Sequence, residues 1–134
     1  MKILITGGCG FLGSNLASYG INNNFDVIVV DNFYREGSRT NFKWLKNIGK
    51  FDFFECDIVD YDSLYQVFKK VSPDVVFHLA GQTAMTTSLD DPILEVKHLK
   101  LLGIAEVAGG LTVAVSLFSE IVPSELVITA CTCF

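Results

Sequence analysis

The first 31 residues constrain the fold of this chain more than any other segment. An apolar stretch of six residues leads into three glycines with GxxGxxG spacing, Gly7, Gly10 and Gly13. A helix is expected to follow, and then a second apolar stretch that ends in Asp31. A strand, a glycine-rich turn, a helix and a second strand in this order predict a βαβ unit, which builds parallel sheets.

The glycines and Asp31 have the spacing of a dinucleotide site. Gly7 permits a tight turn, Gly10 lets backbone amides come close to a pyrophosphate, and Gly13 lets the helix pack closely on the sheet. The helix, expected from Ser14, adds partial positive charge for the phosphates. Asp31 follows Gly13 by 18 residues, near the spacing of about 20 at which a carboxylate binds ribose hydroxyls. Glycines that serve packing alone would not explain Asp31, so we expect a bound dinucleotide.

Asp31 also favours one of the two nicotinamide dinucleotides. Its negative charge would repel a 2′-phosphate, which predicts NAD rather than NADP. Arg35 and Arg39 follow soon after and argue the other way, because arginines are the side chains that bind such a phosphate. On balance NAD is the expected cofactor.

The segments that follow continue the alternation of helices and strands. A polar loop over 32–40 precedes a short helix that ends at Gly49. A strand over 51–56 is apolar enough to be buried on both faces, and another is expected over 74–79. Between them, residues 60–71 carry an apolar stripe with helical spacing. The alternation predicts an α/β fold with a Rossmann-like, doubly wound parallel sheet.

Composition excludes several classes of function. The 134 residues suffice for one domain, and a net charge of −5 without a basic cluster argues against nucleic-acid binding. Four cysteines without a CxxC pair, and no signal-peptide layout, predict reduced thiols in the cytoplasm and no metal site. The apolar stretch 101–117 raises the question of a membrane helix. Glu106 and the Gly109-Gly110 pair favour a buried helix, a turn and a strand instead, so no membrane association is expected.

The glycine pattern, with Thr6 before it and Phe11-Leu12 within it, resembles the extended branch of the short-chain dehydrogenase/reductase superfamily. That superfamily uses a Tyr-x-x-x-Lys pair, in which the ammonium lowers the pKa of the tyrosine. Tyr65 and Lys69 match this spacing, but they lie off the apolar stripe of the helix over 60–71. Superfamily members carry the pair on a later helix. We therefore interpret the match as accidental and assign no catalytic residue.

A second informative stretch follows the strand over 74–79. Residues 78–82 and the hydroxyl-rich segment 83–88 come at the carboxyl end of that strand, the edge at which open α/β sheets bind ligands. His78 itself is expected to be a core histidine whose ring is satisfied. Together with segments 6–18 and 31–41, this stretch resembles the CDP-paratose 2-epimerase family, also called CDP-tyvelose epimerases.

This resemblance implies a function. The family is a group of isomerases that use bound NAD to take a hydride from C2 of a CDP-linked deoxysugar and return it to the other face. A nucleotide-sugar substrate is therefore expected, with nucleotide-sugar 4-epimerases and 4,6-dehydratases as the alternative. Asp57 is expected to hydrogen-bond the adenine and Ile58 to contact it. The alternative is that Asp57 only forms a turn. The implied cofactor-binding residues are Gly7, Gly10, Phe11, Leu12, Asp31, Asn32, Arg35, Asp57, Ile58, Leu79, Ala80, Gly81 and Gln82, and the implied substrate-side residues are Thr86 and Ser88.

The resemblance covers residues 1–92, the NAD-binding part, and residues 93–134 depart from it. We expect this apolar tail to form a helix and then one or more strands of the same domain, with a fifth strand within 126–132. No later Tyr-x-x-x-Lys follows, so the sheet is expected to be incomplete on its C-terminal side. A truncated gene or a change of reading frame near Lys97 would explain this, and the chain alone would be inactive. A non-catalytic dinucleotide-binding module is thus a further alternative, and the oligomeric state is not predicted.

Overall fold

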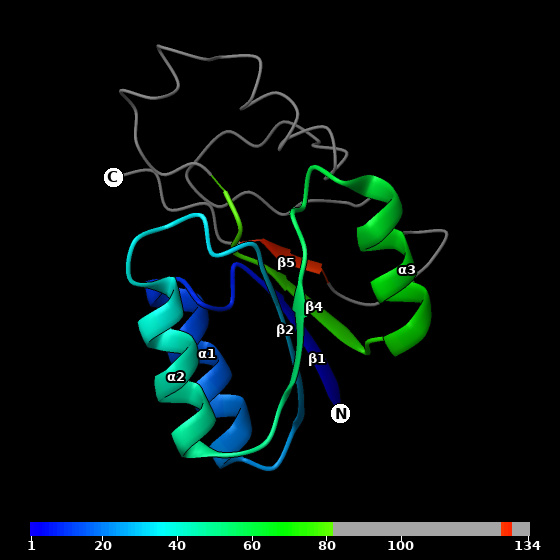
Figure 1. The fold of residues 1–134 in the computed structure, drawn as a ribbon. Coiled ribbons are helices and arrows are strands. Elements are labelled where there is room, and N and C mark those ends of the chain that lie inside the picture. The colour runs from blue at the N-terminus through cyan, green and yellow to red at the C-terminus, as the bar shows by residue number, and fades with distance from the viewer. Residues whose placement is uncertain (82–126, 130–134) are drawn as a thin grey trace, which may run out of the picture.

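The computed structural model of the protein describes residues 1–81 and 127–129, and they form one parallel sheet with helices on both sides (Figure 1). The elements in chain order are β1 (Lys2–Thr6), α1 (Phe11–Asn22), β2 (Asp26–Asp31), α2 (Ser38–Ile48), β3 (Asp52–Glu55), α3 (Tyr61–Val71), β4 (Val75–His78) and β5 (Val127–Thr129). All pairings are parallel, in the order β3-β2-β1-β4-β5. The doubly wound α/β fold and a strand within 126–132 are therefore confirmed.

Alternate residues of the central strands pack into two separate hydrophobic cores, one on each face of the sheet. Figure 1 shows α1 and α2 on one face of the sheet and α3 on the other. Leu4 of β1 lies in the core with Phe68 of α3, whereas its neighbours Ile3 and Ile5 lie in the core with Leu45 of α2. Successive strand residues point to opposite faces, which explains this division. Each such fully buried side chain contributes about 1.5–3 kcal/mol to folding.

Helix α3 follows the predicted pattern closely. Its N-cap Asp60 accepts hydrogen bonds from the backbone N–H of Ser63 at 3.2 Å and from the Ser63 hydroxyl at 2.6 Å. The first contact satisfies one of the backbone amides that have no partner within the helix, and the second holds the Asp60 carboxylate in place. The apolar stripe faces the sheet, and its buried residues are Leu64, Val67, Phe68 and Val71.

Two helices begin earlier than the sequence predicted. Helix α1 starts at Phe11, three residues before Ser14, so Gly13 lies inside the helix. Helix α2 starts at Ser38, inside the predicted loop over 32–40. Both starts follow a glycine, Gly10 and Gly37, and neither cap has a side chain that could have marked the helix start. Glycine N-caps give a weaker sequence signal than Ser, Thr, Asp or Asn.

The prediction that the strand over 51–56 is buried on both faces is wrong. Strand β3 is the edge strand of the sheet, with Asp52 and Glu55 exposed and Phe53 and Phe54 half-buried. Among the described strands, β3 pairs only with β2, so one side of β3 has no neighbouring strand. An edge position needs less apolar surface than a central one, so composition alone misplaced the strand.

The direction of winding reverses at β1, where β2 pairs on one side and β4 on the other. The carboxyl ends of β1 and β4 therefore form a topological switch point, the place where such folds bind ligands. At this point Thr6 pairs with His78, and Nδ1 of His78 lies 2.7 Å from the Thr6 hydroxyl oxygen. His78 is only 4% exposed, which confirms its prediction as a core histidine.

Among the described residues no helix combines the length and apolar character needed to cross a bilayer. The stretch 101–117, Thr132 and the two C-terminal cysteines lie outside the described residues.

Candidate functional site

The glycine-rich turn after β1 closes only because Gly7 and Gly13 carry no side chain. Gly7 has a φ of +66° and donates its N–H to the Val30 carbonyl at 2.8 Å. A Cβ on Gly7 would lie 2.7 Å from the amide nitrogen of Ala80, so the turn touches the end of β4. A Cβ on Gly13 would overlap the Gly7 carbonyl oxygen. The close contact of Gly13 is therefore with the turn itself, rather than with the sheet as the sequence predicted.

Three amides at the start of α1 donate to no other described residue and so can bind an anion. The N–H groups of residues 7–10 donate to Val30, Asp31 and Gly7. The N–H groups of Phe11, Leu12 and Gly13 donate no hydrogen bond within the part of the chain that the structure describes. No acidic residue lies in this first turn. Free amides and the positive end of the helix dipole together favour a phosphate group.

The Asp31 carboxylate lies at this turn, as the spacing predicted. It ends β2, is 8% exposed, and accepts the Cys9 N–H through Oδ2 at 2.9 Å and the Phe33 N–H through Oδ1 at 2.8 Å. A carboxylate has about four lone-pair sites, so about two remain for other donors such as hydroxyl groups. The acid and the glycine turn therefore form one connected unit.

The ends of β2 and β3 bring two further predicted residues together. The Asn32 side-chain amide donates to Asp57 Oδ2 at 2.9 Å, and Asp57 Oδ1 accepts the Val59 N–H at 3.0 Å. Ile58 is 6% exposed and lies in the core beneath α3, so little of its side chain is open to a ligand. Arg35 is exposed on the loop before α2. Asn32 and Asp57 thus extend the site along the sheet edge, while Ile58 mainly packs.

On the other side of the switch point, the chain leaves β4 close to Thr6. Leu79 donates its N–H to the Thr6 carbonyl at 3.0 Å, and Ala80 donates to the Thr6 hydroxyl at 3.4 Å. Gly81 is exposed, and a Cβ there would meet nothing within 4 Å. The predicted residues Gln82, Thr86 and Ser88 lie outside the described residues.

Two residues to which the sequence analysis assigned no role in the site hold the turn. Cys9 is completely buried, and burial and the nearby Asp31 charge raise the pKa of its thiol to about 12. The Asn41 side-chain amide of α2 donates to the Cys9 carbonyl at 2.8 Å. Asn41 precedes the buried Leu45 by four residues, so both lie on one face of α2. A polar residue on the buried face of a short helix was the available signal.

Tyr65 and Lys69 lie on α3. Tyr65 stacks on Tyr61 with ring centroids 6.1 Å apart and is half-buried, while Lys69 is exposed. A position off the apolar stripe predicts an exposed side chain, which is right for Lys69 and only partly right for Tyr65. Within the described residues, no group of three His, Cys, Asp or Glu side chains is placed to hold a metal ion.

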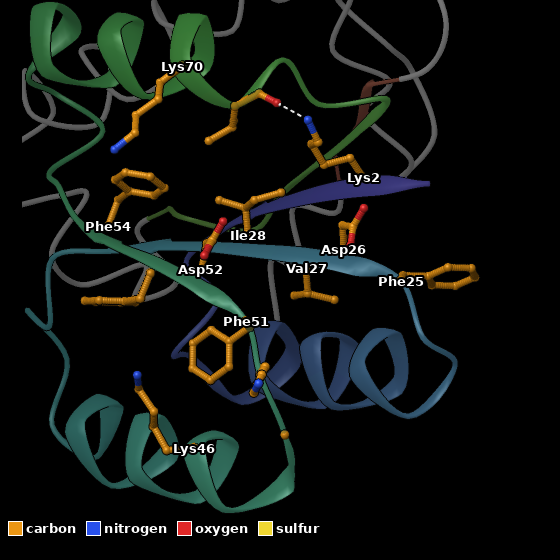
Figure 2. A pocket seen from close by; sticks show the side chains of 14 residues that line it. Lys2, Phe25, Asp26, Val27, Ile28, Lys46, Phe51, Asp52, Phe54 and Lys70 are labelled. Carbon is orange, nitrogen blue, oxygen red and sulfur yellow. Dashed lines mark hydrogen bonds between the residues drawn. The ribbon is translucent and has the colours of Figure 1, made fainter.

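A cavity of about 1000 Å³ lies at the end of the sheet where strands β1, β2 and β3 begin (Figure 2). Lys2 and Asp26 line it at the start of β1 and β2, and the Lys2 ammonium donates to the Val71 carbonyl at 2.7 Å. Lys46 and Lys70 extend over aromatic rings from the last turns of α2 and α3. These are amino ends of strands and carbonyl ends of helices, where phosphates are not stabilised. The cavity is therefore separate from the nucleotide-type site.

Comparison with known proteins assigns the chain to a family. The profile of the GDP-mannose 4,6 dehydratase family matches residues 4–110. The chain is 50% identical over 95 residues to CDP-paratose 2-epimerase of Salmonella typhi, which covers 71% of this chain and 28% of that protein. It is 36% identical over 93 residues to dTDP-glucose 4,6-dehydratase 1 of Escherichia coli, covering 69% of this chain and 26% of that protein.

A solved structure of a related sugar-nucleotide enzyme shares the fold of this chain. The UDP-glucose 4-epimerase of Thermus thermophilus, in complex with NAD, superposes with a TM-score of 0.62 and 32% identity over 72% of this chain and 29% of that one. The sheet and the glycine turn define a Rossmann-like protein of the extended short-chain dehydrogenase/reductase type. The chain belongs to the GDP-mannose 4,6 dehydratase family, and it spans about a quarter of the length of the curated relatives named here.

Proposed function

We propose that this chain is the NAD-binding part of a nucleotide-sugar epimerase that inverts C2 of a CDP-linked sugar. The observation that carries the cofactor assignment is the Asp31 carboxylate, which accepts the Cys9 amide at 2.9 Å and so lies beside the glycine turn. The 50% identity to CDP-paratose 2-epimerase supports the substrate class. An acid that touches the turn can meet the ribose while the turn meets the phosphates.

The residues present fit NAD. The free amides of Phe11 and Leu12 would hold the pyrophosphate, with Gly7 and Gly10 allowing its close approach. The carboxylate of Asp31 would take the ribose hydroxyls and would repel a 2′-phosphate. When bound, NAD would supply a hydride acceptor for the sugar carbon.

The remaining predicted contacts surround these groups. Asn32 and Asp57, which hydrogen-bond each other at 2.9 Å, would border the adenine together with Ile58. Across the switch point, the backbone around Ala80 would lie against the rest of the dinucleotide. The full set of proposed contacts beyond the turn and Asp31 is Asn32, Arg35, Asp57, Ile58, Leu79, Ala80, Gly81 and Gln82, with Thr86 and Ser88 toward the sugar.

Two alternatives rest on specific observations. The identity of 36% to a dTDP-glucose 4,6-dehydratase, and the fold shared with UDP-glucose 4-epimerases, favour a related sugar-nucleotide reaction at C4. A non-catalytic dinucleotide-binding module is favoured by the placement of Tyr65 and Lys69, which lie on α3 rather than on a helix after a fifth strand. In each case we propose a cytoplasmic setting, because Cys9 and Cys56 are free buried thiols.

Calorimetric titration of the chain with NAD and with NADP tests the cofactor, and NMR of CDP-paratose incubated with chain and NAD tests the reaction. Tight binding of NAD is the expected result, and conversion to the C2 epimer would show that this chain itself carries the epimerase activity. Conversion of UDP-glucose or dTDP-glucose instead would favour the C4 alternative. NAD binding without any conversion would mean that this chain by itself acts as a dinucleotide-binding module, and preference for NADP would overturn the cofactor assignment.

A further inference from the structure

We infer that Asn41 is a positioning residue of the cofactor site: from α2 it holds the Cys9 peptide, and so presents the phosphate-binding amides and the Asp31 carboxylate together. This inference rests on the proposed binding of NAD. Its starting observation is the 2.8 Å hydrogen bond from the Asn41 side-chain amide to the Cys9 carbonyl, which joins residues 32 positions apart.

The Asn41 side chain has no local task that would explain this contact. Its own backbone N–H donates to the Gly37 carbonyl at 3.0 Å, as expected in the first turns of a helix. Asn favours helix caps and turns over helix interiors, because its side chain competes for backbone groups. At Asn41 the side chain instead reaches a different segment of the chain. Its hydrogen bond is therefore a tertiary link between α2 and the glycine turn.

Cys9 is the point at which three constraints meet. Its carbonyl accepts from Asn41, its amide donates to Asp31 Oδ2 at 2.9 Å, and its side chain is fully buried in the core that contains Leu45. The N–H of the peptide that Asn41 holds, that of Gly10, donates to the Gly7 carbonyl at 3.0 Å. Fixing this carbonyl therefore also fixes the orientation of the peptide that leads into α1.

The free amides begin immediately after this peptide, at Phe11. A buried carbonyl that loses its donor is costly, so removal of the Asn41 amide favours rotation of the Cys9–Gly10 peptide away from its present orientation. That rotation would move the Phe11 and Leu12 amides and loosen the Cys9 contact to Asp31. Pre-organisation of both groups lowers the ordering cost of binding, so its loss weakens affinity without removing any group that touches the ligand.

The test uses the full chain labelled with 15N, as wild type, Asn41→Ala and the control Asn23→Ala. Asn23 is a matched residue, because its side-chain amide also donates to a backbone carbonyl, that of Tyr19 at 2.8 Å, at the far end of α1. Hydrogen exchange of the Cys9 and Gly10 amides reports the turn directly, and calorimetry gives the Kd for NAD. Asn41→Leu, which keeps the branched shape of the side chain but removes its amide, serves if the alanine variant does not fold.

We expect Asn41→Ala to speed exchange at Cys9 and Gly10 and to raise the Kd for NAD about 5- to 10-fold, the effect of one hydrogen bond of about 1 kcal/mol. Asn23→Ala should change neither quantity. Unchanged exchange at Cys9, or an unchanged Kd in a chain that binds NAD, would overturn the inference. Failure of the wild type to bind NAD would instead refute the proposed function, and the exchange rates would still decide whether Asn41 holds the turn.

Discussion

The substitution Asp31→Asn tests the central contact of the proposed site. In the structure the carboxylate accepts two backbone N–H groups, from Cys9 at 2.9 Å and from Phe33 at 2.8 Å, and is only 8% exposed. Asparagine keeps the shape, but its NH2 group faces one of these two donors. One buried donor is then left without an acceptor, which costs about 1–3 kcal/mol of unfolding free energy. Urea unfolding of the chain without nucleotide measures this cost.

The effect on NAD affinity follows from the same carboxylate. Hydrogen bonds to a charged acceptor contribute about 1.5–3 kcal/mol each. At about 1.4 kcal/mol per tenfold change, the loss of one such bond to a ribose hydroxyl raises the Kd for NAD about 10- to 100-fold. Removing the negative charge also removes repulsion of a 2′-phosphate, so the preference for NAD over NADP should narrow. Calorimetric titration with both dinucleotides measures both changes.

A control on the same strand separates these effects from a general loss of charge. Asp26 is an exposed residue at the first position of β2, whereas Asp31 is the last. Asp26→Asn changes the net charge by the same amount but should leave the Kd for NAD unchanged. Equal affinity of wild type and Asp31→Asn for NAD would refute the reasoning, as would a wild type that prefers NADP.

Three further predictions concern the structure around the site. Gly13→Ala should abolish NAD binding, because its Cβ would overlap the Gly7 carbonyl oxygen. In the control Gly20→Ala, in the same helix, the Cβ meets only side-chain atoms of Val27 and Phe25, so calorimetry and thermal unfolding should show a milder effect. Thr6→Val, an isosteric change, should lower the unfolding free energy by about 1–3 kcal/mol in urea, because it removes the buried hydroxyl 2.7 Å from His78; an unchanged value would contradict this. The raised pKa of Cys9, about 12 against 9.0 in the unfolded chain, means that the unfolded chain ionises first. The unfolding free energy should therefore fall by about 1.4 kcal/mol per pH unit as the pH rises between these values. The unfolding free energy of Cys9→Ala should fall less over the same range.

Much of the fold was readable because local patterns and tertiary packing agree. The stripe on α3 and the end of β2 at Asp31 were predicted correctly, since the stripe has the helical period and the apolar stretch of β2 stops at a carboxylate. The convergence of Asp31 and the glycine turn was also readable, because both lie at carboxyl ends of adjacent parallel strands. Parallel pairing brings together residues that are far apart in sequence.

The errors have different physical causes. The start of α1 was placed at Ser14 because glycines look like helix breakers, yet Gly13 belongs to the helix since only glycine fits against Gly7. Strand β3 looked buried because Phe53 and Phe54 are large and apolar, but its place at the sheet edge follows from strand order. Composition does not encode strand order, so no count of apolar residues could have corrected this.

Asn41 and Cys9 lie in segments that carry the family resemblance, but the sequence did not reveal their roles, because each role depends on a contact with another part of the chain. Neither residue type marks a dinucleotide site, and the contact between them depends on how α2 lies beside the turn, which no motif of either segment records. The glycines and Asp31 supply groups that a nucleotide can touch, whereas Asn41 and Cys9 set the distance between those groups. A motif therefore identifies what a site can bind. The affinity of that site also depends on residues such as Asn41, which hold the turn and the carboxylate in place without touching the ligand.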